Sequence, residues 1–299
     1  MKMSPGLLLP IALALPVAGQ AGTQDLQRSS TGHVVTQVQI RGHGPQLFGV
    51  DTGASATALY EHGRARMGLV PEPGAQIEIY GAGGSQMIQR YRLPRLHVAG
   101  EDAGQLLVSG FPASAKHGEE VMGVLGRDVL GSYMVEFDLV SNRLGLHRPG
   151  ALPAATRGWD EVPIRLMPGI GFVMLDVTLD GVPVTAVLDT GASRTFMNWH
   201  AARAAGVTPG SAGLQTATMA SGVTRHAFDY HTRSFQRIGI GDTAFRPSTL
   251  AIGDLPVFVP MGMDKAPGMI LGLDLMGDRR FVVDYPGKRL LIEREKSSS

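Results

Sequence analysis

Apolar residues recur at every second position in several short segments of this 299-residue chain. The clearest segments span residues 34–40 and 172–179, where the alternation is typical of half-buried β-strands. Asp180-Gly181 follows the second segment and predicts a tight hairpin turn, because both residue types tolerate a left-handed backbone. The pattern therefore indicates short antiparallel strands joined by tight turns.

Helical patterns are confined to two short segments. Residues 201–206 (Ala-Ala-Arg-Ala-Ala-Gly) predict a helix that ends at Gly206, and residues 60–68 predict a second one. Most of the remaining chain consists of strand-like segments separated by Gly and Pro, of which there are 40 and 19. The sequence therefore predicts a mostly β protein with little helix.

An internal repeat organises the chain. Phe-Gly-Val-Asp-Thr-Gly-Ala-Ser at residues 48–55 recurs, 138 positions later, as Ala-Val-Leu-Asp-Thr-Gly-Ala-Ser. The three matched pairs of segments are 48–55 with 186–193, 123–130 with 268–276, and 138–144 with 284–290. Because the matches keep the same order, the repeat is a duplication of one folding unit and not a solenoid.

The duplication predicts two lobes. We expect an N-terminal lobe at residues 22–148 and a C-terminal lobe at residues 158–299, joined by a Pro- and Gly-containing linker at residues 149–157. A chain of this length is also expected to form about two folding units, each large enough to bury its own core.

The N-terminus has the pattern of a signal peptide. Lys2 precedes an apolar run from Leu7 to Val17, and small residues follow. The run is shorter than the roughly 20 residues that cross a bilayer, so no stable membrane span is expected. We therefore predict that residues 1–21 are removed and that the protein is exported, to a periplasm or to the outside of the cell. An apolar N-terminal strand or a single anchor is the alternative.

Composition excludes several functions. Lys and Arg number 27 against 26 Asp and Glu, so there is no basic field for nucleic acid, and no nucleic-acid partner is expected. The chain has no Cys, which excludes disulfides, thiolate metal sites and cysteine nucleophiles. It also has no Gly-x-Ser-x-Gly motif and no spacing typical of metal ligands, so we expect neither a serine hydrolase nor a metal or other cofactor.

In each half of the chain an apolar strand runs directly into Asp-Thr-Gly. A carboxyl group in that position either pairs or titrates. If the lobes pack about a twofold axis, Asp51 and Asp189 meet there, and two ionised carboxylates about 3 Å apart would repel by about 5 kcal/mol at an effective dielectric constant near 20. The pair is therefore expected to share one proton, so that one member acts as a base towards water and the other as an acid.

The neighbouring residues fit a supporting role. Gly53 and Gly191 allow the loop backbone to approach the carboxylates, and Thr52 and Thr190 offer hydroxyls that can bond across the axis. One Asp-Thr-Gly would also fit an ordinary turn. Two copies, each continued by Ala-Ser and followed later by an apolar-apolar-Gly segment, disfavour that interpretation.

With these motifs the sequence resembles the retropepsin-like aspartic proteases, in two copies that cover most of the predicted mature chain. Val-Leu-Gly-Arg-Asp at residues 124–128 is similar to the apolar-apolar-Gly-Arg-Asp/Asn segment of that family, and Ile-Leu-Gly at residues 270–272 is its second copy. The arrangement is similar to a bacterial, single-chain member. The resemblance implies that Gly126 and Gly272 pass behind the catalytic loops.

The resemblance further implies a fold and an activity. The expected fold is two homologous β-barrel-like lobes with the active site in the cleft between them. The expected activity is that of an aspartic endopeptidase, in which Asp51 and Asp189 activate water against a peptide bond of a polypeptide or peptide substrate. Because both half-sites lie in one chain, a monomer with an intramolecular pseudo-dimer is expected.

A flap over the cleft is also implied. Residues 79–85 are similar to the pepsin flap and contain Tyr80, Gly81 and Gly83, although an ordinary Gly-rich hairpin is the alternative. The second lobe offers Ser221 and Gly222 at the equivalent place but no Tyr. The two lobes are therefore expected to differ in their contacts with substrate.

Two departures from pepsins affect the expected chemistry. Ala54 and Ala192 stand three residues after each Asp, as in retroviral proteases, where pepsins commonly carry a hydroxyl. Without that donor the dyad is expected to hold its shared proton to higher pH, which predicts an optimum in mildly acidic solution. A catalytically silent peptide-binding protein on the same fold is the alternative function, but the presence of both Asp residues favours catalysis.

Overall fold

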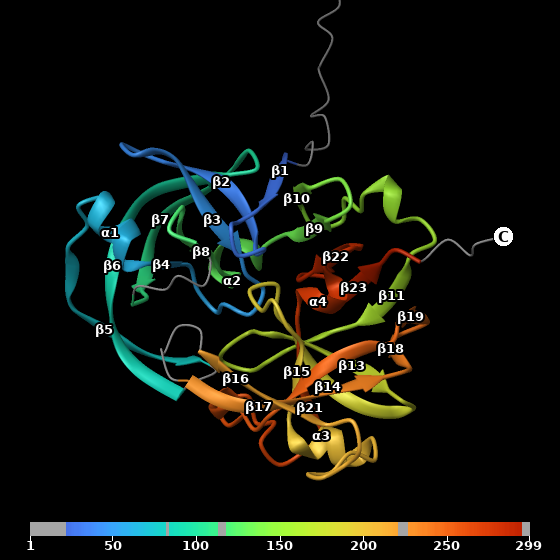
Figure 1. The fold of residues 1–299 in the computed structure, drawn as a ribbon. Coiled ribbons are helices and arrows are strands. Elements are labelled where there is room, and N and C mark those ends of the chain that lie inside the picture. The colour runs from blue at the N-terminus through green and yellow to red at the C-terminus, as the bar shows by residue number, and fades with distance from the viewer. Residues whose placement is uncertain (1–21, 82–83, 113–117, 221–226, 295–299) are drawn as a thin grey trace, which may run out of the picture.

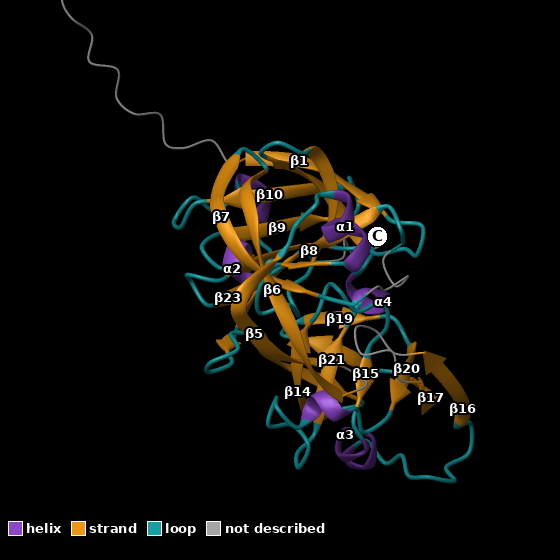
Figure 2. Cartoon of the chain, turned by 90° about the vertical axis from the view of Figure 1, so that its left-hand side faces the viewer, coloured by secondary structure: helices purple, strands orange, loops and turns teal. Residues whose placement is uncertain are grey.

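The computed structural model describes residues 22–81, 84–112, 118–220 and 227–294. Strands make up 51% and helices 10% of the structure, and the strands form two sheets (Figures 1 and 2). The predicted mostly β architecture with two related lobes is therefore confirmed, whereas the lobe limits at residues 22–148 and 158–299 remain predictions.

Both halves of the chain contain many short strands and few helices. The N-terminal half contains β1 (Gly22–Arg28), β2 (Val34–Ile40), β3 (Gly44–Val50), β4 (Ala58–Leu59), α1 (Glu61–Arg66), β5 (Pro71–Gly81), β6 (Gly84–Val98), β7 (Glu101–Gly110), β8 (Val121–Leu125), α2 (Arg127–Leu130), β9 (Met134–Asp138) and β10 (Arg143–His147). The C-terminal half contains η2 (Ala154–Thr156), β11 (Asp160–Pro163), β12 (Arg165–Leu166), β13 (Val173–Leu179), β14 (Val182–Leu188), β15 (Phe196–Met197), α3 (Trp199–Ala204), β16 (Gln215–Ala220), β17 (Ala227–Phe235), β18 (Ile238–Ile240), β19 (Thr243–Phe245), β20 (Ser248–Ile252), η3 (Pro256–Phe258), β21 (Gly268–Leu271), α4 (Leu273–Met276), β22 (Arg280–Asp284) and β23 (Arg289–Ile292).

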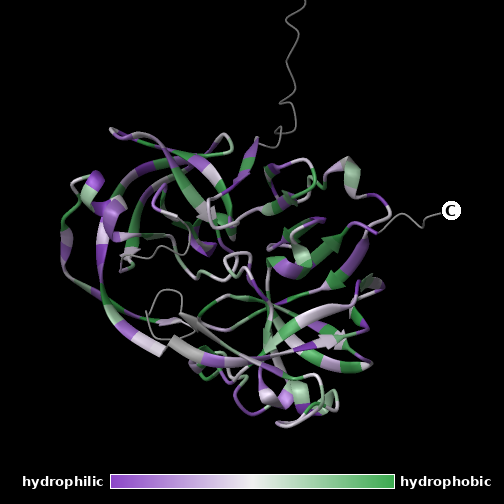
Figure 3. Ribbon diagram, viewed as in Figure 1, coloured by the Kyte–Doolittle hydropathy of each residue, from purple (hydrophilic) through white to green (hydrophobic). Residues whose placement is uncertain are grey.

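The local predictions agree with these elements. Strands β2 and β13 cover the two segments with alternating polarity, and alternate residues of β13 are fully buried. Asp180 and Gly181 connect β13 to β14 with φ values of 48° and 91°, which is the left-handed conformation that the predicted hairpin turn requires. Helix α1 forms inside the predicted segment 60–68, and α3 overlaps the predicted segment 201–206 but begins two residues earlier, at Trp199. Figure 3 shows apolar and polar residues alternating along the strands.

A closed six-stranded barrel forms in the N-terminal half. Its strands follow the order β2, β3, β8, β4, β7 and β6, and the barrel closes where Gln39 and Ile40 of β2 pair with His97 and Leu96 of β6. The inward-facing side chains are buried and apolar, as burial on one face of each strand requires. This barrel supplies the frame for the first Asp-Thr-Gly loop.

Strands from both halves share a second part of the same sheet. Its order is β1, β10, β9, β22, β23 and β11, and the antiparallel pairing of β9 with β22 joins the two halves of the chain. Phe137 and Phe281 stack across this junction with ring centroids 4.8 Å apart. The third repeat forms equivalent hairpins, because Arg143 pairs with Asp138 and Arg289 pairs with Asp284.

The ten-stranded sheet belongs to the C-terminal half. It runs in the order β16, β17, β20, β15, β21, β14, β13, β18 and β19, with β12 pairing to β13. In both halves the strand that leads into Asp-Thr-Gly lies parallel to the strand that leads into Gly126 or Gly272, because β3 pairs with β8 and β14 pairs with β21. The repeated motifs therefore lie side by side within each lobe.

The predicted signal peptide, residues 1–21, lies outside the described residues. Among the residues that the structure does describe, no helix is long and apolar enough to cross a membrane.

Candidate active site

Asp51 and Asp189 each lie one residue beyond a buried strand, β3 and β14. The backbone N–H of Asp51 donates to the carbonyl oxygen of Leu125 at 3.1 Å, and that of Asp189 donates to Leu271 at 3.0 Å. The parallel strand in each lobe therefore fixes the backbone position of the carboxyl group. Both Asp residues are half-buried, so their carboxyl groups are not fully exposed to water.

The two lobes bring these carboxyl groups together. A Cβ atom added to Gly53 would lie 2.4 Å from Cγ of Asp189, and one added to Gly191 would lie 2.4 Å from Oδ2 of Asp51. Each carboxyl group thus packs against the glycine of the opposite loop, where a larger residue has no room. In addition, the N–H of Gly53 donates to Asp51 Oδ1 and that of Gly191 donates to Asp189 Oδ1, both at 2.8 Å.

Thr52 and Thr190 connect the two loops across the axis. Thr52 Oγ1 donates to the carbonyl of Leu188 at 2.7 Å, and Thr190 Oγ1 donates to that of Val50 at 2.6 Å. Each hydroxyl also accepts the backbone N–H of the opposite threonine at 3.0 Å. All four bonds are buried, so the predicted contact across the axis is present and its geometry is the same from both sides.

Gly126 and Gly272 lie directly behind the Asp loops. A Cβ atom on Gly126 would lie 2.4 Å from the carbonyl carbon of Ala56, and one on Gly272 would lie 2.7 Å from that of Arg194. The following N–H groups also bond the loops, since Arg127 donates to the carbonyl of Ala54 at 2.9 Å and Leu273 to that of Ala192 at 2.8 Å. The close approach leaves room only for glycine.

Two further residues in each lobe hold this arrangement, and neither pair was assigned a role from the sequence. Thr57 Oγ1 donates to Asp128 Oδ1 at 2.7 Å and accepts the N–H of Gly126 at 3.2 Å. Thr195 and Asp274 repeat both contacts with Gly272. Their signal was present in the repeat, because both threonines follow the Asp of Asp-Thr-Gly by six positions and both acids follow the glycine by two.

The surroundings of the two Asp residues are not equivalent. Tyr60 and Tyr285 are almost fully buried. Burial is the main cause that raises the pKa of both phenols above the ordinary value, and the negative charge of Asp51 raises it further. At the positions equivalent by the repeat, the sequence has Asn198 and Leu139. Asp51 is therefore close to two neutral phenols that have no counterparts in the other half. Neither tyrosine was predicted from the sequence to belong to the site.

The β5–β6 hairpin contains the predicted flap. Tyr80 and Gly81 end β5, and the hairpin contacts η3 of the C-terminal half, so it reaches from one lobe to the other. Tyr80 is 49% exposed, and its hydroxyl donates to Glu78 Oε2 at 2.8 Å. Hydrogen bonds from Ser85 and Tyr80 lower the pKa of Glu78.

Three predicted flap residues, Gly83, Ser221 and Gly222, lie outside the described residues. The strands on either side of Ser221 and Gly222 pair as a β16–β17 hairpin, which occupies in the second lobe the place of the β5–β6 hairpin in the first.

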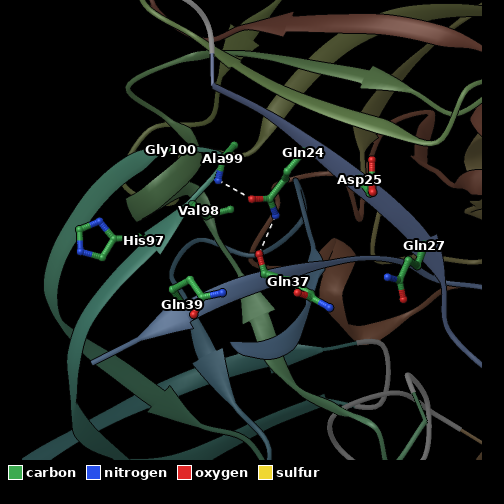
Figure 4. A pocket seen from close by; sticks show the side chains of 9 residues that line it. All are labelled: Gln24, Asp25, Gln27, Gln37, Gln39, His97, Val98, Ala99 and Gly100. Carbon is green, nitrogen blue, oxygen red and sulfur yellow. Dashed lines mark hydrogen bonds between the residues drawn. The ribbon is translucent and has the colours of Figure 1, made fainter. Parts of the chain in front are cut away.

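A metal site or a ligand pocket elsewhere in the described residues would be an alternative to the Asp pair. Among the described residues, no group of His, Asp and Glu side chains is arranged to hold a metal ion. A polar pocket of about 380 Å³ lies between β1, β2 and the turn from β6 to β7 (Figure 4), and it includes neither Asp51 nor Asp189. Its lining is Gln24, Asp25, Gln27, Gln37, Gln39, His97, Val98, Ala99 and Gly100.

Two β lobes that bring paired Asp-Thr-Gly loops together across an axis define a class, the two-lobed aspartyl proteases. A family model described as "Aspartyl protease" matches this chain at residues 36–129 and 175–275, which together make up more than half of its length. The chain belongs to the retropepsin-like aspartyl proteases. No curated protein matches it.

Proposed function

We propose that the protein is an aspartic endopeptidase and that Asp51 and Asp189 form its catalytic dyad. One observation carries the proposal: the carboxyl group of each Asp packs against the glycine of the opposite Asp-Thr-Gly loop. Two carboxyl groups held this close repel each other when both are ionised, and sharing one proton removes that repulsion. A singly protonated pair supplies a base and an acid at one place.

The proposed reaction needs no covalent intermediate. The ionised carboxylate takes a proton from a water molecule while the protonated carboxyl group donates its proton to the carbonyl oxygen of the peptide bond. The water oxygen bonds to the carbonyl carbon and gives a tetrahedral diol. When the C–N bond breaks, the protonated carboxyl group donates its proton to the leaving nitrogen while the other carboxylate takes a proton from a diol hydroxyl. The products are an amine and a carboxylic acid, and the dyad returns to its singly protonated state.

The matched variants Asp51→Asn and Asp189→Asn test the assignment. Each is expected to abolish hydrolysis of an unfolded polypeptide, because an amide cannot exchange the shared proton. Circular dichroism checks that both variants are folded. Substantial turnover by either purified variant contradicts the dyad assignment.

The alternative is a peptide-binding protein that does not hydrolyse its ligand. Incubation of the mature protein with an unfolded polypeptide, from acidic to neutral pH and with or without an aspartic-protease inhibitor, separates the two functions. Inhibitor-sensitive cleavage supports the endopeptidase, whereas binding without cleavage at any pH supports the alternative.

We also propose that the protein is exported. The support is the basic, apolar and small-residue pattern of residues 1–21. N-terminal sequencing of protein recovered from the periplasm or the medium is expected to begin close to residue 22. Recovery of the uncleaved chain from the cytoplasm contradicts this proposal.

A further inference from the structure

The two Asp loops diverge five residues after the catalytic Asp. The first continues Asp-Thr-Gly-Ala-Ser with Ala56, and the second continues it with Arg194. Because the repeat is otherwise strict in this segment, the difference places a cation beside one half of the dyad and a methyl group beside the other.

The backbone of Arg194 is fixed on both sides. Its carbonyl carbon packs against Gly272, as the absence of room for a Cβ atom there shows. The next residue, Thr195, donates its backbone N–H to both carboxylate oxygens of Asp274 at 2.8 and 2.9 Å. The side chain of Arg194 therefore extends from a rigid segment of backbone between the Asp189 loop and β15.

The guanidinium group of Arg194 lies against an aromatic ring. Its central carbon is 5.7 Å from the ring centroid of Tyr230 on β17, a strand of the hairpin that corresponds to the flap. Tyr230 is buried and packs edge-on against Phe196 at 5.4 Å, so the ring is held in place. Arg194 consequently lies between the Asp189 loop and this hairpin.

Arg194 is half-buried and forms no ion pair with any described carboxylate. A contact with the face of a tyrosine ring orients the guanidinium group but uses none of its N–H donors for a hydrogen bond. A planar guanidinium group with free donors is suited to binding a carboxylate through two parallel hydrogen bonds.

The first lobe has apolar residues at the equivalent positions. Phe196 and Thr232 both pair with Ala251, and Ala58 and Arg90 both pair with Ser109. Thr232 and Arg90 are therefore equivalent positions in the two lobes. Tyr230 and Ile88 are also equivalent, because each lies two residues before one of them. Ile88 is buried and lies where Tyr230 supports Arg194, while Ala56 replaces Arg194 itself.

We propose that Arg194 determines specificity for an acidic residue, Asp or Glu, at one fixed position on one side of the cleaved bond. The inference rests on the proposed endopeptidase function and adds the substrate class. An extended peptide bound over the dyad places side chains against both lobes, and the position five residues after the Asp carries a cation, Arg194, in the second lobe and Ala56 in the first. The position bound by the first lobe, with Ala56, is expected to show no preference for acid.

The test compares peptides that differ only by Glu or Gln at one position, scanned through the positions on both sides of the bond. The wild-type protein is expected to cleave the Glu peptide with a kcat/KM about tenfold higher at one position, because a charge-assisted pair with a partly desolvated guanidinium replaces a neutral contact. Arg194→Ala, which installs the residue of the first lobe, is expected to reduce this Glu/Gln ratio to about one. Arg194→Lys is expected to retain part of the preference, and Arg194→Glu to reverse it in favour of Lys.

Arg203 supplies a matched control. It is an exposed arginine of the same lobe that also lies over an aromatic ring, 5.8 Å from the centroid of Trp199 on α3. Arg203→Ala is expected to keep the wild-type Glu/Gln ratio. The inference is overturned if the wild-type ratio is close to one at every position, or if folded Arg194→Ala keeps the wild-type ratio.

A binding measurement separates this inference from the proposed function. Fluorescence anisotropy of labelled Glu and Gln peptides on the Asp51→Asn protein needs no turnover. Tighter binding of the Glu peptide, lost in the Asp51→Asn, Arg194→Ala double variant and weakened by 1 M salt, supports Arg194 even if the wild-type protein hydrolyses nothing. Equal binding of the two peptides by the Asp51→Asn protein overturns the inference, whatever the wild-type activity.

Discussion

At the scale of single residues, several hydrogen bonds and close contacts constrain the two Asp-Thr-Gly loops. Thr52 and Thr190 are 1% exposed, and each hydroxyl both donates and accepts a hydrogen bond across the axis. A buried network in which every member is paired holds its atoms in place, because breaking one hydrogen bond leaves a second buried polar group without a partner. The carboxyl groups are positioned by these threonines as well as by their own loops.

Replacing Thr52 by valine tests this network. Thr52→Val keeps the shape but leaves the carbonyl of Leu188 and the N–H of Thr190 without partners, so we expect the free energy of unfolding to fall by about 2 to 4 kcal/mol. Urea denaturation measures the loss. Thr52→Ser keeps the hydroxyl and is expected to cost less than about half as much. Equal stability of the valine variant and the wild type contradicts the role assigned to the hydroxyl.

The position three residues after each Asp is expected to set the pH optimum. A serine hydroxyl at position 54 or 192 can donate to the ionised carboxylate, which favours the ionised form and lets the dyad lose its proton at lower pH. The acid limb of the rate profile is therefore expected to move to lower pH by about one unit in Ala54→Ser and in Ala192→Ser. Ala204→Ser, at an exposed position on α3, is the control. An acid limb that stays in place or moves upward refutes this explanation of the two alanines.

At the scale of elements, each lobe builds its half-site from the same few pieces. A strand ends in the Asp loop, a parallel strand ends in glycine, and a one-turn helix begins directly after that glycine. Thr57 with Asp128, and Thr195 with Asp274, bond the helix to the segment that follows the Asp loop. The site is therefore supported by packed elements, and not by the loops alone.

The glycine before α2 is expected to be irreplaceable. In Gly126→Ala the new methyl group would lie 2.4 Å from a backbone carbon of Ala56, so the loop behind Asp51 must shift. We expect a loss of about 2 kcal/mol or more in the free energy of unfolding and a large loss of activity. Thermal denaturation and peptide hydrolysis measure the two effects.

Gly253→Ala is the matched control for that substitution. Its methyl group would lie 3.6 Å from Cβ of Tyr230, which is an ordinary contact, and it is expected to change stability by less than about 1 kcal/mol. If Gly126→Ala is as stable and active as Gly253→Ala, the close packing behind the Asp loop is not required.

At the scale of the whole molecule, one sheet carries strands from both halves. The pairing of β9 with β22 lies at the centre of six strands that join the lobes. Side chains add further contacts: Arg28 donates to the carbonyl of Gly277 at 2.7 Å, and the guanidinium group of Arg127 packs on Gly171. Both half-sites are thus united within one chain.

We therefore expect an active monomer. Specific activity is expected to stay constant on dilution, and sedimentation velocity is expected to give a single species of about 31.7 kDa or slightly less after loss of residues 1–21. A specific activity that falls on dilution together with dissociation of a dimer contradicts the intramolecular site.

The sequence by itself determined the features that depend on local pattern and on the repeat. Alternation predicted β2 and β13, and Asp180-Gly181 predicted the turn between β13 and β14. The duplicated motif identified Asp51, Asp189 and the threonines and glycines beside them. These features were readable because a strand, a tight turn and a repeated segment each leave a signature within a few neighbouring residues.

Only the tertiary structure decided which distant residues meet. The pairing of β9 with β22, the approach of Tyr60 and Tyr285 to Asp51, and the contact of Arg194 with Tyr230 join segments that carry no common local signal. The sequence predicted that the two flaps differ, but the phenols of Tyr60 and Tyr285 near Asp51 became evident only from the packing of the chain. Such contacts depend on how whole strands and lobes pack, and packing is a property of the assembled chain that no local sequence period encodes.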